Sequence, residues 1–174
     1  MKWRRNVLTA LLAAALCVMA PWAVPLGPVP VTLATLGVYL AAGLLGPWRG
    51  ATAVGLYLLL GAVGVPVFAG FSAGFPVLFG VTGGFLWGYL PCVMVAGWLS
   101  RRGHPALWPL WLLGGTLILY AVGAVWYMLQ TDVGLGGAVL TVLPSLPGEL
   151  IKIVVATALT IPLRERVRRL LSYV

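Results

Sequence analysis

Charged side chains are scarce in this sequence, and that scarcity excludes most soluble architectures. Only 8% of the 174 residues are charged, and three of them are acidic, whereas soluble globular domains carry about 25% charged residues. A chain with so few charges cannot cover a water-facing surface, so lipid is the solvent that fits it. The sequence therefore predicts one membrane domain over residues 1–174.

Residue types that perform catalysis or bind metals are almost absent. Cys17 and Cys92 lie far apart in apolar runs, and the single histidine, His104, lies in a basic loop. None of these matches a metal-ligand spacing, and no GxxxxGK[ST] phosphate loop is present. We therefore expect no metal, no cofactor and no enzymatic activity, so that any ATP-driven step belongs to partner subunits.

The net charge of +8 comes from bases that lie at the ends of apolar segments. This pattern is typical of cytoplasmic loops under the positive-inside rule. It is not the folded basic face of a nucleic-acid reader, so we exclude nucleic acid as a partner. The groups are Lys2, Arg4 and Arg5; Arg49; Arg101 and Arg102; and Arg164, Arg166, Arg168 and Arg169.

Apolar runs near the length of about 20 residues that crosses a bilayer predict six membrane-spanning helices. The first resembles a signal peptide, but Pro21 disfavours cleavage after Ala20, so we interpret the segment as a retained span. A loop is expected from Thr131 to Leu146. The predicted spans are residues 7–24, 31–45, 50–65, 83–100, 107–130 and 147–163, the second and third being short.

Six spans place both termini on one side of the membrane. With the N-terminus inside, ten of the eleven bases lie in inner loops or tails and the outer loops hold none. The sequence therefore predicts an all-α membrane protein with N-in/C-in topology. The remaining base is Lys152, which lies inside the sixth predicted span.

The segment 66–82 is apolar but too rich in glycine and proline for a regular helix. Irregular backbone at membrane depth is tolerated only where it is buried in protein or lines a cavity. We therefore expect an outer loop that folds back over the helices. The absence of side chains on its glycines permits close approach to a ligand.

Glu149 and Lys152 are charges expected at membrane depth, and their spacing of three places them on one helical face. A charge within the membrane costs at least about 2.5–3.5 kcal/mol. One interpretation is structural, with Glu149 favoured near a helix N-terminus and Lys152 pairing with it. The other is a polar recognition site at the outer end of the bundle, lidded by the glycine-rich loop.

Five segments in this order resemble the BioY family, and together they extend over nearly the whole chain. BioY proteins are the biotin-binding S components of energy-coupling-factor (ECF) vitamin transporters. The resemblance implies an S-component-like bundle in a prokaryotic cytoplasmic membrane, with biotin as the ligand. It also implies a transmembrane coupling protein and two ATPase subunits, although some members are thought to act with little or no partner. The segments are residues 28–33, 42–50, 58–68, 82–85 and 147–152.

The resemblance assigns residues to both ends of biotin. Glu149 and Lys152 match a family motif associated with gripping the ureido ring, with Glu in place of the usual Asp. Ser72 stands where the family often has an Asn that helps to hold the valerate carboxylate, and its hydroxyl can donate the same bond. Backbone at Gly74 belongs to the same loop.

Two positions depart from the family pattern, and both concern the carboxylate end of biotin. Leu86 replaces an Arg that some relatives carry after the GGY/F motif, which excludes a salt bridge from that position. Ala34 replaces a frequent Gln. The carboxylate is therefore left mainly to Ser72 and loop backbone.

Aromatic and small residues complete the predicted contacts. Phe68, Phe85, Tyr120 and Trp126 are candidates to surround the apolar ring and tail of biotin, with bundle packing as the alternative. On the first span, Ala10 and Ala14 match the AxxxA pattern with which S components dock the coupling protein, and internal packing is the alternative. Two other functions stay open, an S component for another vitamin and a structural membrane protein without a ligand.

Overall fold

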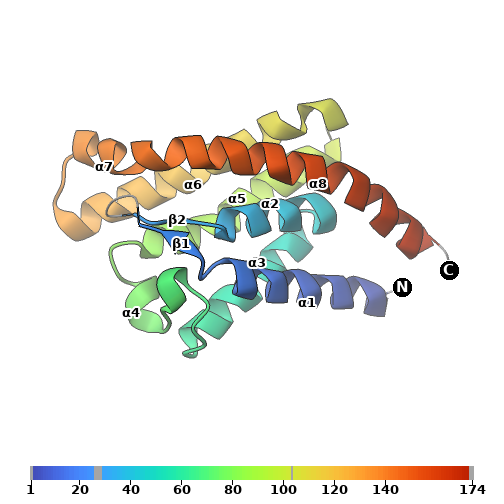
Figure 1. The fold of residues 1–174 in the computed structure, drawn as a ribbon, viewed down its shortest axis with the longest axis horizontal. Coiled ribbons are helices and arrows are strands. Elements are labelled where there is room, and N and C mark those ends of the chain that lie inside the picture. The colour runs from blue at the N-terminus through green and yellow to red at the C-terminus, as the bar shows by residue number, and fades with distance from the viewer. Residues whose placement is uncertain (1, 26–28, 103, 173–174) are drawn as a thin grey trace.

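The computed structural model describes residues 2–25, 29–102 and 104–172 as a bundle of helices with one short β-ribbon (Figure 1). Pro28 of the first family segment and the side chains of Lys2, Arg102, Arg168 and Arg169 lie outside the described part. The helices are α1 (Lys2–Met19), α2 (Ala34–Leu45), α3 (Pro47–Ala62), α4 (Phe75–Leu78), α5 (Gly83–Arg102), α6 (Trp108–Thr131), α7 (Leu135–Val142) and α8 (Leu146–Ser172), the 3-10 turns are η1 (Ala69–Phe71), η2 (Pro105–Leu107) and η3 (Leu143–Ser145), and the strands are β1 (Ala23–Val24) and β2 (Val31–Thr32).

A helix lies in each predicted span, but the helices differ in their capacity to cross a membrane. Three stretches of the described chain are long and apolar enough to do so, Gly83–Arg101, Trp108–Thr131 and Leu135–Val167. Helix α2 has 12 residues, which extend about 18 Å at 1.5 Å per residue, against a hydrocarbon core of about 30 Å. Helix α2 is therefore too short to cross the hydrocarbon core by itself. The β-ribbon precedes it and the turn to α3 follows it.

The prediction of a loop from Thr131 to Leu146 is wrong, because this segment contains α7 and η3. The segment contains the adjacent glycines Gly136 and Gly137, and glycine is a poor helix former. In the folded chain, Ala138 and Val142 are buried against Phe85 and Tyr127. This packing overrides the local preference and places α7 over the end of α6.

The last helix, α8, continues past the end of the predicted span at residue 163 and runs to Ser172, so that much of the basic tail is helical. Pro162 lies inside α8, where it removes one backbone N–H donor. Figure 1 shows α8 along the upper edge of the molecule, with the start of α1 and the end of α8 at the same end. The β-ribbon, α4 and α7 lie toward the opposite end.

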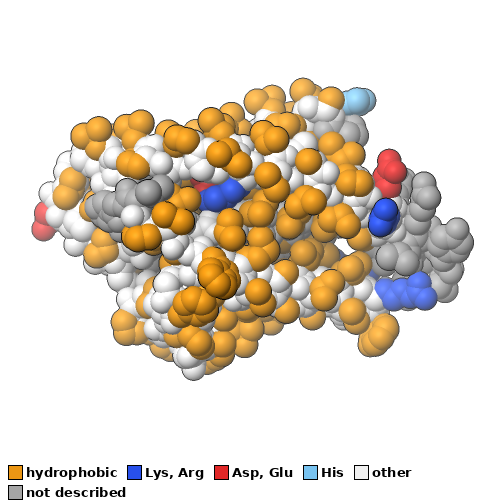
Figure 2. All heavy atoms as spheres, in the orientation of Figure 1, with side chains coloured by type: hydrophobic (Ala, Val, Ile, Leu, Met, Phe, Trp, Pro, Cys, Tyr) orange, Lys and Arg blue, Asp and Glu red, His pale blue; other side chains and the backbone are white. Residues whose placement is uncertain are grey.

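The interior is formed where α5 packs on α6, α3 and α2, while α8 packs on α2 and α1 packs on α2 and α3. Val38, Leu112 and Val93 are fully buried there. The outer surface is also apolar, as Figure 2 shows by the side chains that cover most of one face. Exposed leucines such as Leu117 and Leu129 on α6 fit a surface in contact with lipid.

The glycine-rich segment after α3 folds back over the helices. Phe68 is completely buried, and its ring packs edge-on against Tyr57 at 5.6 Å between centroids. The N–H of Gly74 donates to the carbonyl of Gly61 at 2.7 Å. A Cβ at Gly61 would lie 2.0 Å from the Phe68 ring, so only glycine admits this ring at the end of α3.

Gly83→Ala is expected to lower the free energy of unfolding by about 1–3 kcal/mol, the usual cost of overpacking. A Cβ at Gly83 would lie 2.0 Å from the backbone oxygen of Leu78, and backbone cannot rotate away as a side chain can. Gly55→Ala in α3 is the matched control, because a Cβ there meets nothing within 4 Å. Thermal unfolding in detergent compares the two variants, and equal melting temperatures would contradict this account.

Candidate functional site

The first turns of α8 carry a buried ion pair that faces α2. Glu149 is 4% exposed and Lys152 is 7% exposed. Lys152 Nζ lies 2.6 Å from Glu149 Oε1 and also donates to Thr35 Oγ1 at 3.0 Å. The Thr35 hydroxyl in turn donates to Glu149 Oε1 at 2.9 Å. The expected shared face of α8 is therefore present, and α2 supplies the third member of the cluster.

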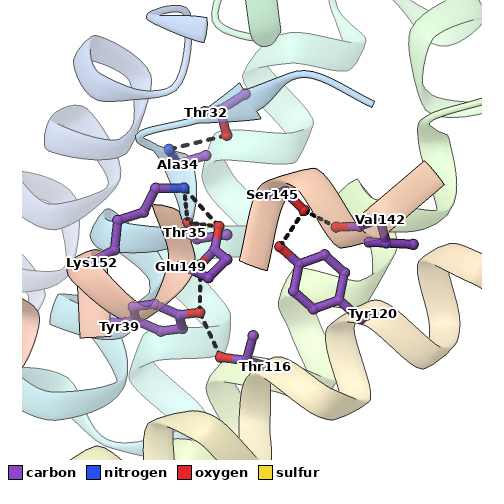
Figure 3. A network of polar contacts seen from close by, with 10 residues as sticks. All are labelled: Thr32, Ala34, Thr35, Tyr39, Thr116, Tyr120, Val142, Ser145, Glu149 and Lys152. Atoms are coloured by element: carbon purple, nitrogen blue, oxygen red, sulfur yellow. Dashed lines mark hydrogen bonds and ion pairs between the residues drawn. The ribbon is translucent and has the colours of Figure 1, made fainter. Parts of the chain in front are cut away.

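A second hydroxyl from α2 binds the other carboxylate oxygen. Tyr39 Oη donates to Glu149 Oε2 at 2.8 Å and lies 2.6 Å from Thr116 Oγ1 of α6. Thr116 also contacts the carbonyl of Leu112 at 2.8 Å. Because the Tyr39 proton is committed to the carboxylate, the single Thr116 proton serves either Tyr39 or Leu112. Figure 3 shows this chain of contacts running from Lys152 through Glu149 and Tyr39 to Thr116.

Sequence reasoning missed Thr35, Tyr39 and Thr116, although a signal for two of them was present. Thr35 and Tyr39 are four residues apart in an otherwise apolar run, so they lie on one face of α2. Polar side chains in membrane helices usually face the bundle interior. Nothing in the sequence, however, indicated that this face of α2 meets the start of α8.

The hydrogen-bond network does not use every donor of Lys152 or every acceptor position of Glu149. An ammonium group has three N–H donors and a carboxylate has about four lone-pair sites. Within the described chain, Lys152 uses two donors and Glu149 accepts three hydrogen bonds. One N–H of Lys152 and one acceptor position of Glu149 are therefore not used by hydrogen bonds within the described chain. A polar molecule that offers both a carbonyl and an N–H matches this pair.

A small cavity of about 40 Å³ lies beside Glu149. The ring of Phe85 meets that of Tyr120 edge-on, with centroids 6.2 Å apart. Tyr120 Oη hydrogen-bonds Ser145 Oγ at 2.9 Å, which joins α6 to η3 at the cavity wall. The lining residues come from the ribbon, α2, α5, α6 and the η3–α8 junction, and they are Val29, Pro30, Val31, Thr32, Thr35, Phe85, Tyr89, Leu119, Tyr120, Ser145 and Glu149.

The structure brings some of the predicted site residues together. Glu149, Phe85 and Tyr120 line the cavity, and Lys152 contacts Glu149 directly. Figure 2 shows basic and acidic side chains next to each other within an otherwise apolar face, over the region where α2 and α8 meet. This group therefore combines the charged pair with an aromatic wall.

The other predicted biotin contacts lie elsewhere in this structure. Ser72 donates its hydroxyl to the carbonyl of Ala69 in its own turn at 2.8 Å. The backbone N–H of Gly74 donates to the carbonyl of Gly61 in α3, and the ring of Phe68 packs against Tyr57. The indole N–H of Trp126 donates to the carbonyl of Gly80 at 3.0 Å. None of the four lines the described cavity.

The two positions that depart from the family pattern are buried, whereas the two alanines predicted to dock the coupling protein are exposed on α1. Leu86 is 8% exposed and Ala34 is 1% exposed, so both contribute to packing. Ala10 and Ala14 lie on the exposed face of α1 together with Leu11. The two alanines are therefore available to another helix and are not used for packing inside this chain.

Tyr39→Phe is expected to weaken ligand binding about tenfold, because it removes a hydrogen bond to a charged group. The phenolic oxygen binds Glu149 Oε2, so its loss frees the carboxylate to turn away from its present position. Tyr57→Phe is the control, since Tyr57 is equally buried but packs against Phe68 away from the ion pair. Calorimetric titration measures both affinities, and equal losses in the two variants would contradict a positioning role.

Comparison with known proteins identifies the group to which this sequence is related. The model of the BioY family matches residues 1–169. The chain belongs to the BioY family. A biotin transporter BioY of Rhodobacter capsulatus is 41% identical to this BioY-family chain over 170 residues, covering 87% of this chain and 88% of the relative. A biotin transporter BioY of Thermotoga maritima is 43% identical over 121 residues, covering 68% and 72%.

A solved structure supports the same relationship for the fold of this BioY-family chain. It is the crystal structure of the S-component for biotin from an ECF-type ABC transporter. The two chains superpose with a TM-score of 0.88 at 26% sequence identity, covering 94% of this chain and 92% of the other. The arrangement of helices around the buried pair is thus shared with a biotin S component.

Proposed function

We propose that this chain is the biotin-binding membrane subunit of an uptake system. Its family membership and its likeness to the biotin S component support the function. The observation that carries the site is the buried Glu149–Lys152 pair, which is held by Thr35 and Tyr39 and whose Glu149 lines an aromatic cavity. A buried charge pair is a weak source of stability, so its presence in an apolar chain favours a role in recognition.

The chemistry of biotin fits the donor and the acceptor that the pair leaves open. The ureido ring offers a carbonyl, which can accept the remaining N–H of Lys152, and N–H groups, which can donate to Glu149. The bicyclic ring is otherwise apolar, and the rings of Phe85 and Tyr120 provide a wall for it. Ser72 and the backbone at Gly74 are proposed to reach the carboxylate end, together with Phe68 and Trp126 around the tail.

Ligand entry requires the cavity to enlarge. Pockets for ligands of drug size enclose about 300–1,000 Å³, whereas the cavity beside Glu149 encloses about 40 Å³. The contact between Tyr120 and Ser145 closes one wall between α6 and η3. We propose that the α7–η3 segment moves outward when biotin enters, and that movement of the glycine-rich loop brings Ser72 toward the ligand.

The proposed membrane arrangement is a multi-pass subunit in a prokaryotic cytoplasmic membrane, with six spans and both termini inside. The start of α1 and the end of α8 lie at one end of the bundle (Figure 1), where basic side chains are seen in Figure 2, and the candidate site lies toward the other end. The subunit would work with an ATP-driven ECF module of a coupling protein and two ATPase subunits. Ala10 and Ala14 on the exposed face of α1 are the proposed docking points for the coupling protein.

Calorimetric titration of the purified full-length chain with biotin tests the function. The expected result is saturable binding of biotin and no comparable binding of other vitamins, such as thiamine or riboflavin, in the same detergent. Absence of biotin binding by a folded chain would overturn the proposed function. Stronger binding of another vitamin would instead reassign the ligand while keeping the role as an S component.

A further inference from the structure

Four arginines line a hollow at the end of the molecule where α1 begins and α8 ends, and this hollow consists of two adjoining recesses. Two adjoining recesses of about 330 Å³ and about 190 Å³ share Arg101, Leu44, Leu45 and Val167. Figure 2 shows basic side chains at this end, on both sides of a recess between α1 and α8. The arginines that line the two recesses come from four helices, and they are Arg5 of α1, Arg49 of α3, Arg101 of α5 and Arg164 of α8.

Two of these arginines are held in place by hydrogen bonds to backbone carbonyls. Arg101 Nη2 donates to the carbonyl of Leu45, at the end of α2, at 3.0 Å. Its guanidinium lies against Gly46, where a Cβ would meet Arg101 Nε at 2.3 Å and where φ is +77°. Arg164 donates to the carbonyl of Ser100 at 3.3 Å and lies over the Trp108 ring at 5.5 Å. These contacts fix the positions of both guanidinium groups at the walls of the recesses.

The remaining walls of the recesses show what kind of anion fits. No carboxylate lines either recess among the described residues, and the other walls are apolar, with Leu8, Leu44, Leu45 and Val167. Leu163 lies one turn before Val167 on α8 and adds exposed apolar surface next to the recesses. A free phosphate would contact only the arginines. A phospholipid would contact the arginines with its phosphate and the apolar side chains with its acyl chains. Basic pockets between membrane helices on the cytoplasmic side are suited to lipid head groups.

We propose that the hollow formed by Arg5, Arg49, Arg101 and Arg164 binds the phosphate head group of an anionic phospholipid of the inner leaflet. The positive-inside rule accounts for arginines at this membrane level, but it does not require them to face one recess. Arg166 shows the difference, because it lies on the exposed surface of α8 and lines neither recess. The lipid site is independent of the biotin site, which lies toward the opposite end of the bundle.

Native mass spectrometry of the purified full-length chain, with phosphatidylglycerol and phosphatidylcholine offered in equal amounts, tests this site. We expect the wild type to retain phosphatidylglycerol in preference to phosphatidylcholine. The double variant Arg49→Gln/Arg101→Gln is expected to weaken this retention about thirtyfold, given the usual contribution of each arginine near a lipid surface. Arg5→Gln/Arg49→Gln provides a second pair that leaves the contact of Arg101 with Leu45 intact.

The matched control is Arg4→Gln/Arg166→Gln, which removes the same charge from the same end of the molecule. Unchanged retention in this control and loss in both recess variants support the site. Equal loss in recess and control variants would show attraction by net charge alone and overturn it. No preference for phosphatidylglycerol would overturn it as well, and displacement of the lipid by inorganic phosphate would show a phosphate site in place of a lipid site. Biotin titration of each variant confirms that it is folded.

Discussion

Lys152→Met is expected to weaken biotin binding by at least about thirtyfold, the cost of truncating one partner of a buried charge pair. The substitution removes the remaining N–H that is proposed to bind the ureido carbonyl. It also removes the ammonium that lies 2.6 Å from Glu149 Oε1, so the carboxylate is no longer neutralised. Glu149→Ala is expected to lose affinity to a similar extent, because it removes the acceptor for the ureido N–H groups and leaves Lys152 without its partner.

Calorimetric titration with biotin measures both variants against the wild type. Arg166→Met is the matched control, since it removes a positive charge from the exposed surface of the same helix and should leave the affinity unchanged. Wild-type affinity in both Lys152→Met and Glu149→Ala would show that biotin binds elsewhere. Such a result would refute the site while leaving the proposed function intact, because that function rests on binding by the intact chain.

The second large effect concerns stability. Lys152→Met alone is expected to lower the free energy of unfolding by about 3–5 kcal/mol, because it leaves an uncompensated charge in the interior. The double variant Glu149→Gln/Lys152→Met is expected to recover most of this loss. Its amide oxygen can still accept from Thr35 and Tyr39, which donate to Glu149 in the wild type. The double variant should therefore be folded and yet fail to bind biotin.

Thermal unfolding in detergent, combined with biotin titration, separates a recognition role from a structural role. If the pair served only to fix α8 against α2, the double variant would remain folded and would keep its affinity for biotin. If the double variant were as unstable as Lys152→Met, the account based on an uncompensated charge would be wrong. The expected combination, restored folding without binding, is specific to a pair whose charges are used for the ligand.

Local features of the site were accessible from the sequence because they depend on helical geometry alone. Glu149 and Lys152 are three residues apart, and this spacing places them on one face of any helix. Their place in an apolar chain marked them as a site without knowledge of their neighbours. The aromatic wall was accessible only in part, since Phe85 and Tyr120 line the cavity while Phe68 and Trp126 do not.

Contacts between distant segments were not accessible in this way. Thr35 lies 114 residues from Glu149 in the sequence, and its role follows only from the packing of α2 on α8. The α7 helix was missed for a related reason, because its stability comes from Ala138 and Val142 packing against α5 and α6 rather than from its own residues. The hydroxyl of Ser72 donates to the carbonyl of Ala69 in the same turn, and the family pattern alone did not indicate this contact.

The sequence by itself determined that the chain belongs in lipid, that its bases lie at helix ends and that one acid and one base share a face of the last helix. These properties follow from composition and from periods of a few residues. The tertiary structure decided which side chains surround that pair, how small the cavity beside it is and which arginines face one hollow. Those properties depend on how helices distant in the sequence pack together, and packing of this kind leaves no short-range pattern in the chain.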